Sequence, residues 1–415
     1  MTLYQEMPLP EALHKALHLM NFTQPTPIQE QAIPLVLQHR DVMACAQTGT
    51  GKTGAFSIPM LTQLIDKPQM NALILAPTRE LALQINEVIT KLTAFTPRIR
   101  PALLIGGLPM ARQLRALSLK PRIIVATPGR LVDHLQQRNL SLHNHSFLVL
   151  DEADRMLDMG FAPQLKEILR HLPKERQTLL FSATLPTEIM KLAQNYLQDP
   201  AHIAIETTEQ SQPKIAHTVI ETTGEHKNDV LLDQLNTRIG SIIIFAKTKH
   251  RTDRLAKYLA KFGHSVTRIH GDRSQSQRES ALLGFRNGTF RILVATDIAA
   301  RGIDVPHIAH VINYDLPQVP EDYVHRIGRT ARAGATGEAL CLLVPEEHLQ
   351  WRRIVKLYLK HDNDIHAAWG QQSHVRSHRS QAPMPEVTRK PSPMRSSAAR
   401  TPSSSPSIIR PRSTP

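Results

Sequence analysis

The sequence has few cysteines and no long apolar segment. Among its 415 residues, no window approaches the roughly 18 consecutive apolar residues that a membrane-spanning helix requires. The N-terminal residues Met1 to Glu6 have neither the basic region nor the apolar stretch of a secretory signal. These absences argue against a membrane protein and predict a cytoplasmic location.

Cysteine and histidine are not arranged as metal ligands. Cys45 and Cys341 lie far apart inside apolar runs, and the 21 histidines fall in no metal-ligand spacing. We therefore expect the two thiols to be buried and chemically inert. The sequence also shows no coiled-coil heptads, which leaves the oligomeric state open, and a monomer is the expectation.

The formal net charge of +14 predicts a polyanionic partner, of which nucleic acid is the commonest, although basic charge can also serve solubility alone. About half of this charge lies in residues 371–415, where Ser, Pro and Arg replace the periodic apolar residues. This tail contains eight basic residues and one acidic residue, and its composition predicts disorder.

Two folded domains are expected before the tail. With 41% hydrophobic and 21% charged residues, the chain can bury enough apolar surface to fold, and its length suggests two cores at about 100–200 residues per domain. Short apolar runs alternate with helical patterns, as in βαβ units with a parallel sheet buried on both faces. The polar segment 206–214 separates the two halves and is interpreted as a flexible linker.

The predicted fold class is therefore α/β, with two tandem parallel-sheet domains. The expected strands are 42–45, 72–75, 123–125, 147–150 and 178–181 in the first half, and 241–245, a run ending near 269, 292–294, 310–312 and 339–343 in the second.

A glycine-rich segment follows the first expected strand and precedes a helical run, which is the context of a phosphate-binding loop. Glycines let backbone N–H groups face phosphate oxygens, and the N-terminus of the helix adds partial positive charge. Lys52 is expected to reach the outer phosphates of a nucleotide, and Thr53 to bind Mg²⁺. Ala46 stands where the general pattern has glycine. The segment reads Ala46-Gln47-Thr48-Gly49-Thr50-Gly51-Lys52-Thr53.

An acidic quartet, Asp151-Glu152-Ala153-Asp154, directly follows another apolar strand. Ligands of open α/β sheets bind at the carboxyl ends of strands, where these acids would lie. Asp151 can then hold Mg²⁺ through its waters, and Glu152 can orient and deprotonate the water that attacks a γ-phosphate. The alternative, a solvated acidic loop, is disfavoured because both elements occur in order after apolar strands.

Asp-Glu-Ala-Asp after a phosphate loop resembles the signature of the DEAD-box RNA helicases. Upstream, Asn21 to Gln29 resembles the Q motif of that family, whose glutamine reads adenine and whose aromatic residue stacks on it. The resemblance implies these roles for Gln29 and Phe22, with Tyr4 in the isolated upstream aromatic position. The amide of Gln29 can accept from N6 and donate to N7 of adenine. Asn21 replaces the usual glycine.

Three segments of the first half resemble the motifs through which the family holds the RNA backbone. Their glycine and Thr-Pro turns expose N–H donors, and arginine pairs with phosphate through two hydrogen bonds. The RNA-binding residues implied here are Pro77, Thr78, Arg79, Gly106, Gly107, Thr127, Gly129 and Arg130. The segment Ser182-Ala183-Thr184 resembles the motif that couples hydrolysis to strand separation in the family, and the resemblance implies this role for Ser182 and Thr184. Hydroxyls at these positions can bridge the acidic quartet to neighbouring backbone.

The second half resembles the remaining motifs of the family. Arg329 and Arg332 are three residues apart, so on one helix they share a face and can both reach the γ-phosphate from the second domain. Such an arginine neutralises transition-state charge. Ala331 replaces the usual glycine. The resemblance further implies a ribose contact for Asp304 and RNA contacts for Gln275, Arg278 and Thr296.

The resemblance spans about residues 4 to 345 and implies two RecA-like domains and an enzyme. It divides the chain into a Q-motif region (1–30), an ATP-binding domain (31–205), the linker (206–214), a C-terminal helicase domain (215–370) and the tail (371–415). The activity implied is an ATP-dependent RNA helicase that unwinds short duplexes locally or remodels RNA–protein complexes, with ATP and Mg²⁺ and with Lys52, Asp151, Glu152, Arg329 and Arg332 as catalytic residues.

Among family members the sequence looks most like the bacterial RhlE-type proteins, on the stretches Asp151 to Phe161 and Ala295 to Val305 and on the basic tail. The tail is expected either to tether the enzyme to RNA without sequence specificity or merely to solvate it. The sequence leaves open which RNA is remodelled, with ribosome precursors, messengers and the RNA-degradation machinery as alternatives.

Two other functions compete with this interpretation. The chain could use ATP only to clamp RNA, as a scaffold or annealing chaperone, but a clamp does not need the hydrolysis residues Glu152, Arg329 and Arg332. It could also be a DNA helicase of the same architecture, because the preference for RNA comes from the resemblance and, physically, from contacts to the 2′-hydroxyl.

Overall fold

The computed structural model describes residues 3–46, 49–205, 215–300, 308–331 and 336–358. The predictions made for the tail, for the linker 206–214 and for Gln47, Thr48, Asp304 and Arg332 concern residues outside these ranges.

The first domain is built around a sheet whose seven strands all run parallel, within the described residues. The strands follow one another across the sheet in the order β3-β4-β2-β5-β6-β1-β7. In chain order they are β1 (Val42–Cys45), β2 (Ala72–Leu75), β3 (Pro101–Leu104), β4 (Ile123–Ala126), β5 (Phe147–Leu150), β6 (Gln177–Ser182) and β7 (Ala201–Ala204).

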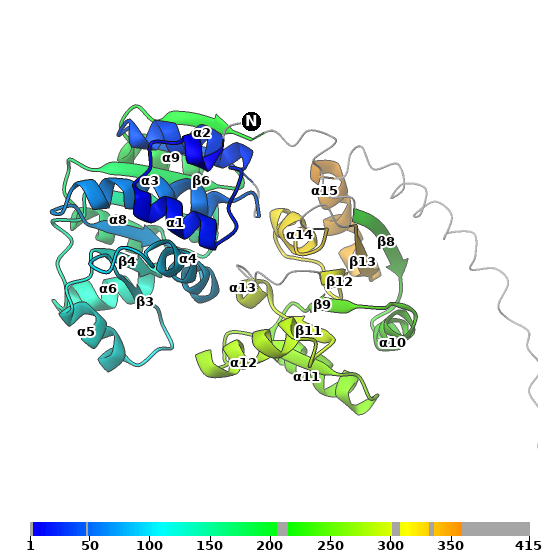
Figure 1. Ribbon diagram of the computed structural model, residues 1–415. Helices are drawn as coiled ribbons and strands as arrows, with labels where there is room; N and C mark the ends of the chain where they lie inside the picture. The colour runs from blue at the N-terminus through cyan, green and yellow to red at the C-terminus, as the bar shows by residue number, and fades with distance from the viewer. Residues whose placement is uncertain (1–2, 47–48, 206–214, 301–307, 332–335, 359–415) are drawn as a thin grey trace, which may run out of the picture. The chain divides into compact units, whose positions relative to one another are not determined.

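Helices connect these strands and cover both faces of the sheet (Figure 1). They are η1 (Tyr4–Glu6), α1 (Glu11–Leu19), α2 (Pro27–Leu37), α3 (Lys52–Asp66), α4 (Arg79–Leu92), α5 (Met110–Ser118), α6 (Pro128–Gln136), α7 (Ala153–Asp158), α8 (Ala162–Arg170) and α9 (Thr187–Tyr196). Several begin where the local chemistry predicts. For example, Thr78 caps α4 because its Oγ1 accepts a hydrogen bond of 3.2 Å from the Leu81 N–H.

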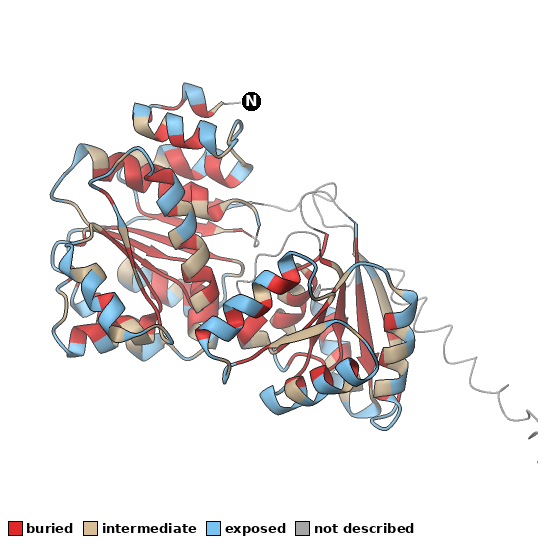
Figure 2. Cartoon of the chain, turned by 60° about the horizontal axis from the view of Figure 1, so that its bottom comes forward, coloured by how far each residue is buried: buried red, intermediate tan, exposed pale blue. Residues whose placement is uncertain are grey.

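Successive residues of each strand pack into different cores, because their side chains point to opposite faces of the sheet. In β5, Phe147 and Val149 join a core with α1 to α4, whereas Leu148 and Leu150 join a second core with α6 to α9. All four are fully buried. Figure 2 shows the strands in the interior of the chain largely in red, the colour of buried residues. Each such side chain contributes about 1.5–3 kcal/mol of transfer free energy, so the central strands are held in place from both sides.

The second domain repeats this architecture around six parallel strands within the described residues, in the order β10-β11-β9-β12-β13-β8. The strands are β8 (Ile215–Glu221), β9 (Ser241–Phe245), β10 (Val266–Ile269), β11 (Ile292–Ala295), β12 (Ile308–Asn313) and β13 (Gly337–Leu343). The helices are α10 (Lys227–Thr237), α11 (Lys249–Lys261), α12 (Gln275–Arg286), α13 (Asp297–Ala300), α14 (Pro320–Ile327), η3 (Pro345–Glu347) and α15 (His348–Tyr358). The prediction of two tandem parallel-sheet α/β domains is confirmed.

The two cysteines differ in their surroundings. Cys341 is fully buried in β13, where burial raises the pKa of its thiol to about 12. Cys45 is only half-buried at the end of β1, and its Sγ lies 3.4 Å from the Ala183 carbonyl oxygen. Among the residues that the structure describes, none of the helices combines the length and the hydropathy that crossing a bilayer requires.

Candidate functional site

Six neighbouring strands of the first sheet place the site residues predicted for this domain at their carboxyl ends, which together form one edge of the sheet. The strands are parallel, so their carboxyl ends lie together. The ends of β3, β4 and β2 lead into the three segments predicted to hold RNA, and the ends of β5, β6 and β1 lead into the acidic quartet, Ser182 to Thr184 and the phosphate loop. The amino acids predicted to bind RNA and those predicted to bind ATP therefore occupy two adjoining halves of the edge that the carboxyl ends of the strands form.

The phosphate loop closes on itself through Lys52, the first residue of α3. Its buried Nζ donates a hydrogen bond of 3.1 Å to the carbonyl oxygen of Ala46. Gly49 and Gly51 have φ values of +87° and +94°, which favour glycine. Ala46 has no such backbone conformation, so the alanine is accommodated where the general pattern has glycine.

The Q-motif region is tied to this loop by the Gln29 side chain. Nε2 of Gln29 donates to the Gly51 carbonyl oxygen at 2.9 Å. A Cβ atom at Gly51 would lie 2.7 Å from Nε2, and one at Gly54 would lie 2.4 Å from it. Both glycines are therefore required for the close approach of Gln29. Asn21 has a φ of +56°, a conformation that asparagine tolerates better than most residues, which explains how it can replace glycine.

The two aromatic residues of this region face each other. The rings of Tyr4 and Phe22 are 6.2 Å apart between centroids and inclined by 24°. Both line a hollow of about 820 Å³, whose wall also includes Phe95; Gln29 does not line it. Phe22 is half-buried and Tyr4 is buried, so Phe22 is the more accessible of the two residues.

The acidic quartet lies at the junction of β5 and α7. Glu152 precedes the helix with φ 51° and ψ 52°, a left-handed conformation that costs a non-glycine residue roughly 1–2 kcal/mol. Its N–H donates to Oδ1 of Asp151 at 3.0 Å. Strained backbone of this kind is concentrated at functional sites, so the conformation supports a functional role for Glu152.

Asp151 has the character of a cation ligand. Burial raises the pKa of its carboxyl to about 6, although the nearby Lys52 acts in the opposite direction. A bound cation would stabilise the ionised form of this buried carboxylate. Together with the Thr53 hydroxyl on the first turn of α3, Asp151 offers the hard oxygen ligands that Mg²⁺ prefers. The residues present thus fit a magnesium ion.

Asp154 joins the acidic quartet to the segment after β6. Its Oδ2 accepts from the backbone N–H of Ala183 at 3.1 Å, and from the N–H and Oγ1 of Thr184 at 3.0 and 3.1 Å. Ser182 instead donates its hydroxyl to the Thr184 carbonyl oxygen at 2.6 Å. The bridge between the two motifs is therefore made by Asp154, with Thr184 as its side-chain partner.

Two of the residues predicted to bind RNA, Gly106 and Gly107, lie against the Arg79 guanidinium. A Cβ atom at Gly107 would lie 2.4 Å from an Arg79 Nη atom, and one at Gly106 would lie 3.1 Å from the other. Gly107 also has a φ of +84°. The two glycines thus make room for the arginine, and burial lowers its pKa.

The other predicted RNA residues of the first domain are placed at the starts of α4 and α6. Pro77 is buried, and Thr127 precedes α6 as its N-cap residue. Gly129 has open space where a Cβ would lie, so sterics do not require glycine there. The Nε of Arg130 lies 3.4 Å from Oδ2 of Asp133.

Two of the second-domain residues predicted to bind RNA are engaged with carboxylates. Nε of Arg278 donates to Oε1 of Glu80 at 2.8 Å, and both side chains are buried. Gln275 donates to Oε1 of Glu279 at 3.2 Å. Thr296 follows β11 directly and is half-buried. The RNA contacts of these residues stay predictions.

The expectation that Arg329 lies on a helix is wrong. Helix α14 ends at Ile327, and Arg329 lies in the turn that follows, where its Nε donates to the His325 carbonyl oxygen at 3.1 Å. The chain then pairs Thr330 with Ile308 and adopts a φ of +54° at Ala331. The left-handed residue breaks the helical path directly after Arg329 and Thr330, so Arg329 lies on no helix; Arg332 lies outside the described residues.

Ala331 therefore occupies a conformation that favours glycine. We expect Ala331→Gly to raise the free energy of unfolding by about 0.5–1 kcal/mol, because relief of left-handed strain exceeds the added entropy of the unfolded chain. Urea unfolding would measure this change. Ala260→Gly, at an exposed position inside α11, is the control and should instead destabilise by about 1 kcal/mol. If Ala331→Gly and Ala260→Gly destabilise the protein equally, the backbone of Ala331 is not strained.

Sequence reasoning assigned no role to Arg326, which organises the second domain. Its Nε and Nη2 donate to the two carboxylate oxygens of Asp297 at 2.5 and 2.7 Å, and its Nη1 donates to Asn313 Oδ1 at 2.9 Å. The side chain is fully buried. The available signal was an arginine between apolar residues in Tyr323 to Ile327, because a buried arginine needs a carboxylate partner, here the partly buried Asp297.

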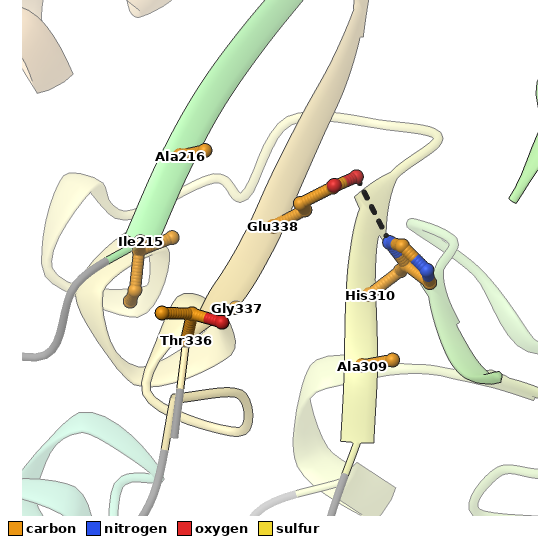
Figure 3. Close-up of a pocket in the computed structure, with 7 residues that line it drawn as sticks. All are labelled: Ile215, Ala216, Ala309, His310, Thr336, Gly337 and Glu338. Atoms are coloured by element: carbon orange, nitrogen blue, oxygen red, sulfur yellow. Dashed lines mark hydrogen bonds and ion pairs between the residues drawn. The ribbon is translucent and has the colours of Figure 1, made fainter. Parts of the chain in front are cut away.

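A separate hollow of about 560 Å³ lies on the second domain, at the starts of β8 and β13 and beside β12 (Figure 3). Within it, Nδ1 of His310 lies 3.0 Å from Oε2 of Glu338. None of the predicted site residues lines this hollow.

Comparisons with known proteins agree with this arrangement. A family model described as "DEAD/DEAH box helicase" matches residues 26–192, and one described as "Helicase conserved C-terminal domain" matches residues 226–334. The DEAD-box ATP-dependent RNA helicase CshA of Geobacillus kaustophilus (strain HTA426) is 45% identical over 349 residues, which cover 84% of this chain and 74% of the relative. CshA of Bacillus subtilis (strain 168) is 44% identical over 353 residues, covering 85% and 71%.

Solved structures show the same fold. Dbp5 of S. cerevisiae bound to RNA and ADP BeF3 superposes with a TM-score of 0.76 at 35% identity, over 85% of this chain and 92% of that chain. Mss116p bound to ssRNA and AMP-PNP gives a TM-score of 0.77 at 32% identity, over 85% and 76%. Because family models match most of both domains and curated relatives match across both, the chain belongs to the family of DEAD-box ATP-dependent RNA helicases.

Proposed function

We propose that this chain is an RNA-dependent ATPase that unwinds short RNA duplexes locally or remodels RNA–protein complexes. The observation that carries this proposal is the strand order of the first sheet. The amino acids assigned to ATP follow β1, β5 and β6, and those assigned to RNA follow β2, β4 and β3. Both groups lie at the carboxyl ends of neighbouring strands, at one edge of the sheet. Such an edge can bind both ligands side by side, so that each can influence the other.

In the proposed reaction, Lys52 exchanges its bond to the Ala46 carbonyl for the outer phosphates of ATP. Backbone N–H groups of the loop bind phosphate oxygens, and Glu152 orients the attacking water and accepts its proton. Mg²⁺, when held by Asp151 and Thr53, supplies positive charge to the phosphates.

Asp154 offers a route from hydrolysis to RNA. Its three hydrogen bonds to residues 183 and 184 tie the segment after β6 to the helix that starts at the acidic quartet. A shift of the quartet on loss of the γ-phosphate would therefore move the Thr184 segment as well. We assign Ser182 and Thr184 to this coupling.

The second domain completes the site in this proposal. Arg329 and Arg332 supply positive charge to the γ-phosphate when ATP and RNA are bound, and Asp304 contacts the ribose. Because both ligands would favour the same arrangement of the domains, ATP and RNA should bind cooperatively, with a coupling of about 1–3 kcal/mol.

RNA is the proposed nucleic acid, contacted through its backbone without sequence specificity. The relatives Dbp5 and Mss116p were solved with RNA or ssRNA, and they share the fold of both domains. Backbone N–H groups and Arg79 beside Gly106 and Gly107 suit phosphate contacts, and the 2′-hydroxyl provides the distinction from DNA.

Steady-state phosphate release tests this function against its two alternatives. The full chain is assayed without nucleic acid, with single-stranded RNA and with DNA of the same sequence. We expect stimulation by RNA and much less by DNA. Equal stimulation by DNA would favour a DNA helicase, and turnover unaffected by RNA would favour a clamp.

Several finer assignments are part of the proposal. The RhlE-type assignment stays a prediction, because the curated relatives reported above carry the name CshA. Action as a monomer in the cytoplasm, on ribosome precursors or with the RNA-degradation machinery, also stays a prediction. Sequencing RNA crosslinked to a form arrested before hydrolysis would identify the substrate.

The tail is proposed to tether the enzyme to RNA. For single strands, the logarithm of the association constant falls with the logarithm of salt concentration by about 0.7 per phosphate neutralised. Deleting residues 371–415, with their eight basic residues, should therefore weaken RNA binding and flatten its salt dependence. A tail of the same length with those residues changed to glutamine should behave like the deletion. If affinity and slope match the wild type, the tail only solvates the protein.

A further inference from the structure

The hydrogen bonds of Gln29 leave little of its amide available for a base. Oε1 accepts from the Thr26 N–H at 2.8 Å and from the Tyr4 hydroxyl at 2.5 Å, whereas Nε2 donates to the Gly51 carbonyl oxygen at 2.9 Å. The side chain is only 4% exposed. Three of the four hydrogen-bonding positions of the amide are therefore used within the protein.

The orientation of this amide follows from its backbone partners. A backbone N–H can only donate, so the atom facing Thr26 must be the oxygen. A backbone carbonyl can only accept, so the atom facing Gly51 must be the nitrogen. The Tyr4 hydroxyl consequently acts as the donor toward Oε1. A flip of the amide would place two mismatched pairs in a buried site.

The remaining hydrogen of Nε2 does not distinguish the purines. Adenine and guanine both present N7 as an acceptor, and they differ in the neighbouring group, which is a donor amine in adenine and an acceptor oxygen in guanine. Reading the amine requires an acceptor, and both lone pairs of Oε1 are taken. Of the two donors to Oε1, the Thr26 N–H is fixed at the start of α2, so only the Tyr4 hydroxyl can give up its hydrogen bond.

Tyr4 is held firmly in its place. It is 3% exposed, its ring stacks with Phe22, and it belongs to η1. Burial raises the pKa of the hydroxyl to about 12, so it keeps its proton at neutral pH and remains a donor. The hydroxyl therefore occupies the acceptor of Gln29 until another donor displaces it.

We propose that the Tyr4 hydroxyl is a specificity-determining group that competes with the exocyclic amine of adenine for Oε1 of Gln29. This inference rests on the proposed function and on the adenine contact that the family resemblance implies for Gln29. In the wild type, a bond to the amine replaces the bond to Tyr4 and leaves a buried hydroxyl without its partner, so the amine adds little net affinity. Removing the hydroxyl frees the acceptor.

The test compares ATP with the triphosphate of purine riboside, which keeps N7 and lacks the amine. Equilibrium dissociation constants of both nucleotides are measured for the full chain and for Tyr4→Phe. We expect the preference for ATP to rise about 3–10-fold in Tyr4→Phe, the effect of one hydrogen bond. An unchanged preference would overturn the inference. A lower preference would overturn it too, because the hydroxyl itself would then accept the amine.

Two further variants separate competition from a structural effect. In Gln29→Ala the acceptor is absent, so adding Tyr4→Phe should leave the preference for ATP unchanged. Tyr314→Phe removes a hydroxyl that donates to Asn228 Oδ1 at 2.9 Å in the second domain, and it should keep the wild-type preference. A change of the preference in the Gln29→Ala background would contradict the role of Oε1.

The two proposals fail separately in these measurements. Nucleotide binding does not depend on turnover, so the ratio of dissociation constants tests the role of Tyr4 even if hydrolysis is absent. Loss of RNA-stimulated phosphate release in the wild type would count against the proposed function alone. A normal ATPase with the same preference in Tyr4→Phe would count against the inference alone.

Discussion

Glu152→Gln should lower RNA-stimulated ATP turnover by about 10²–10⁴-fold, the usual contribution of a positioned general base. The amide keeps the size of the carboxylate but cannot take a proton from the attacking water. Because ATP and RNA still bind, the variant should accumulate as the complex that contains both ligands. Phosphate release measures the first effect, and the dissociation rate of labelled RNA in the presence of ATP measures the second.

The matched control is Glu175→Gln, which changes an exposed glutamate of the same domain and should keep wild-type turnover. Since Glu152 has a left-handed backbone, thermal unfolding of both variants should be compared to exclude a change in folding. Wild-type turnover in Glu152→Gln would refute the role assigned to this carboxylate. Slow turnover with fast RNA release would separate catalysis from trapping.

Arg329→Ala should lower turnover by about 10³–10⁵-fold, because an arginine that neutralises charge on the γ-phosphate contributes that much in related reactions. The nucleotide affinity should change far less, since the phosphate loop and Gln29 belong to the first domain. Single-turnover hydrolysis at saturating RNA and ATP would separate the chemical step from binding.

Two comparisons make this test specific to position 329. Arg353→Ala, on the exposed side of α15, should be active. Arg326→Ala should chiefly reduce stability, because it leaves the partly buried Asp297 carboxylate without its partner. Turnover in Arg329→Ala within a few fold of wild type would remove this arginine from the catalytic set.

The central strands could be predicted from the sequence, whereas of the four edge strands only β10 was expected, as the run ending near 269. Buried runs such as Phe147 to Leu150 are apolar at every position because helices cover both faces. Strands β3, β7 and β8 were missed because they lie at sheet edges, where partial exposure replaces the continuous apolar run. In β7, for example, buried and exposed residues alternate.

In the candidate site, too, the sequence pattern predicted some features, whereas others depend on contacts that form only in the folded chain. Motif order placed the phosphate loop, the acidic quartet and the Ser182 segment at strand ends, since parallel strands deliver their carboxyl ends together. Spacing alone wrongly put Arg329 on a helix, because it cannot reveal the left-handed residue that follows. Nor can it show that Tyr4 already occupies the acceptor of Gln29, which depends on a contact between residues 25 positions apart.

Because of the position of β5, a single backbone amide at its end can report on both ligand sites. Strand β5 is the neighbour of β2, which leads to the RNA residues, and of β6, which leads to the coupling segment. At its end, the Asp151 N–H donates to the Leu75 carbonyl oxygen at 3.0 Å, so one amide hydrogen spans the boundary between the two halves of the edge. Its exchange with deuterium would therefore register, at a single backbone position, how firmly the two ligand sites are held together at each stage of the ATP cycle.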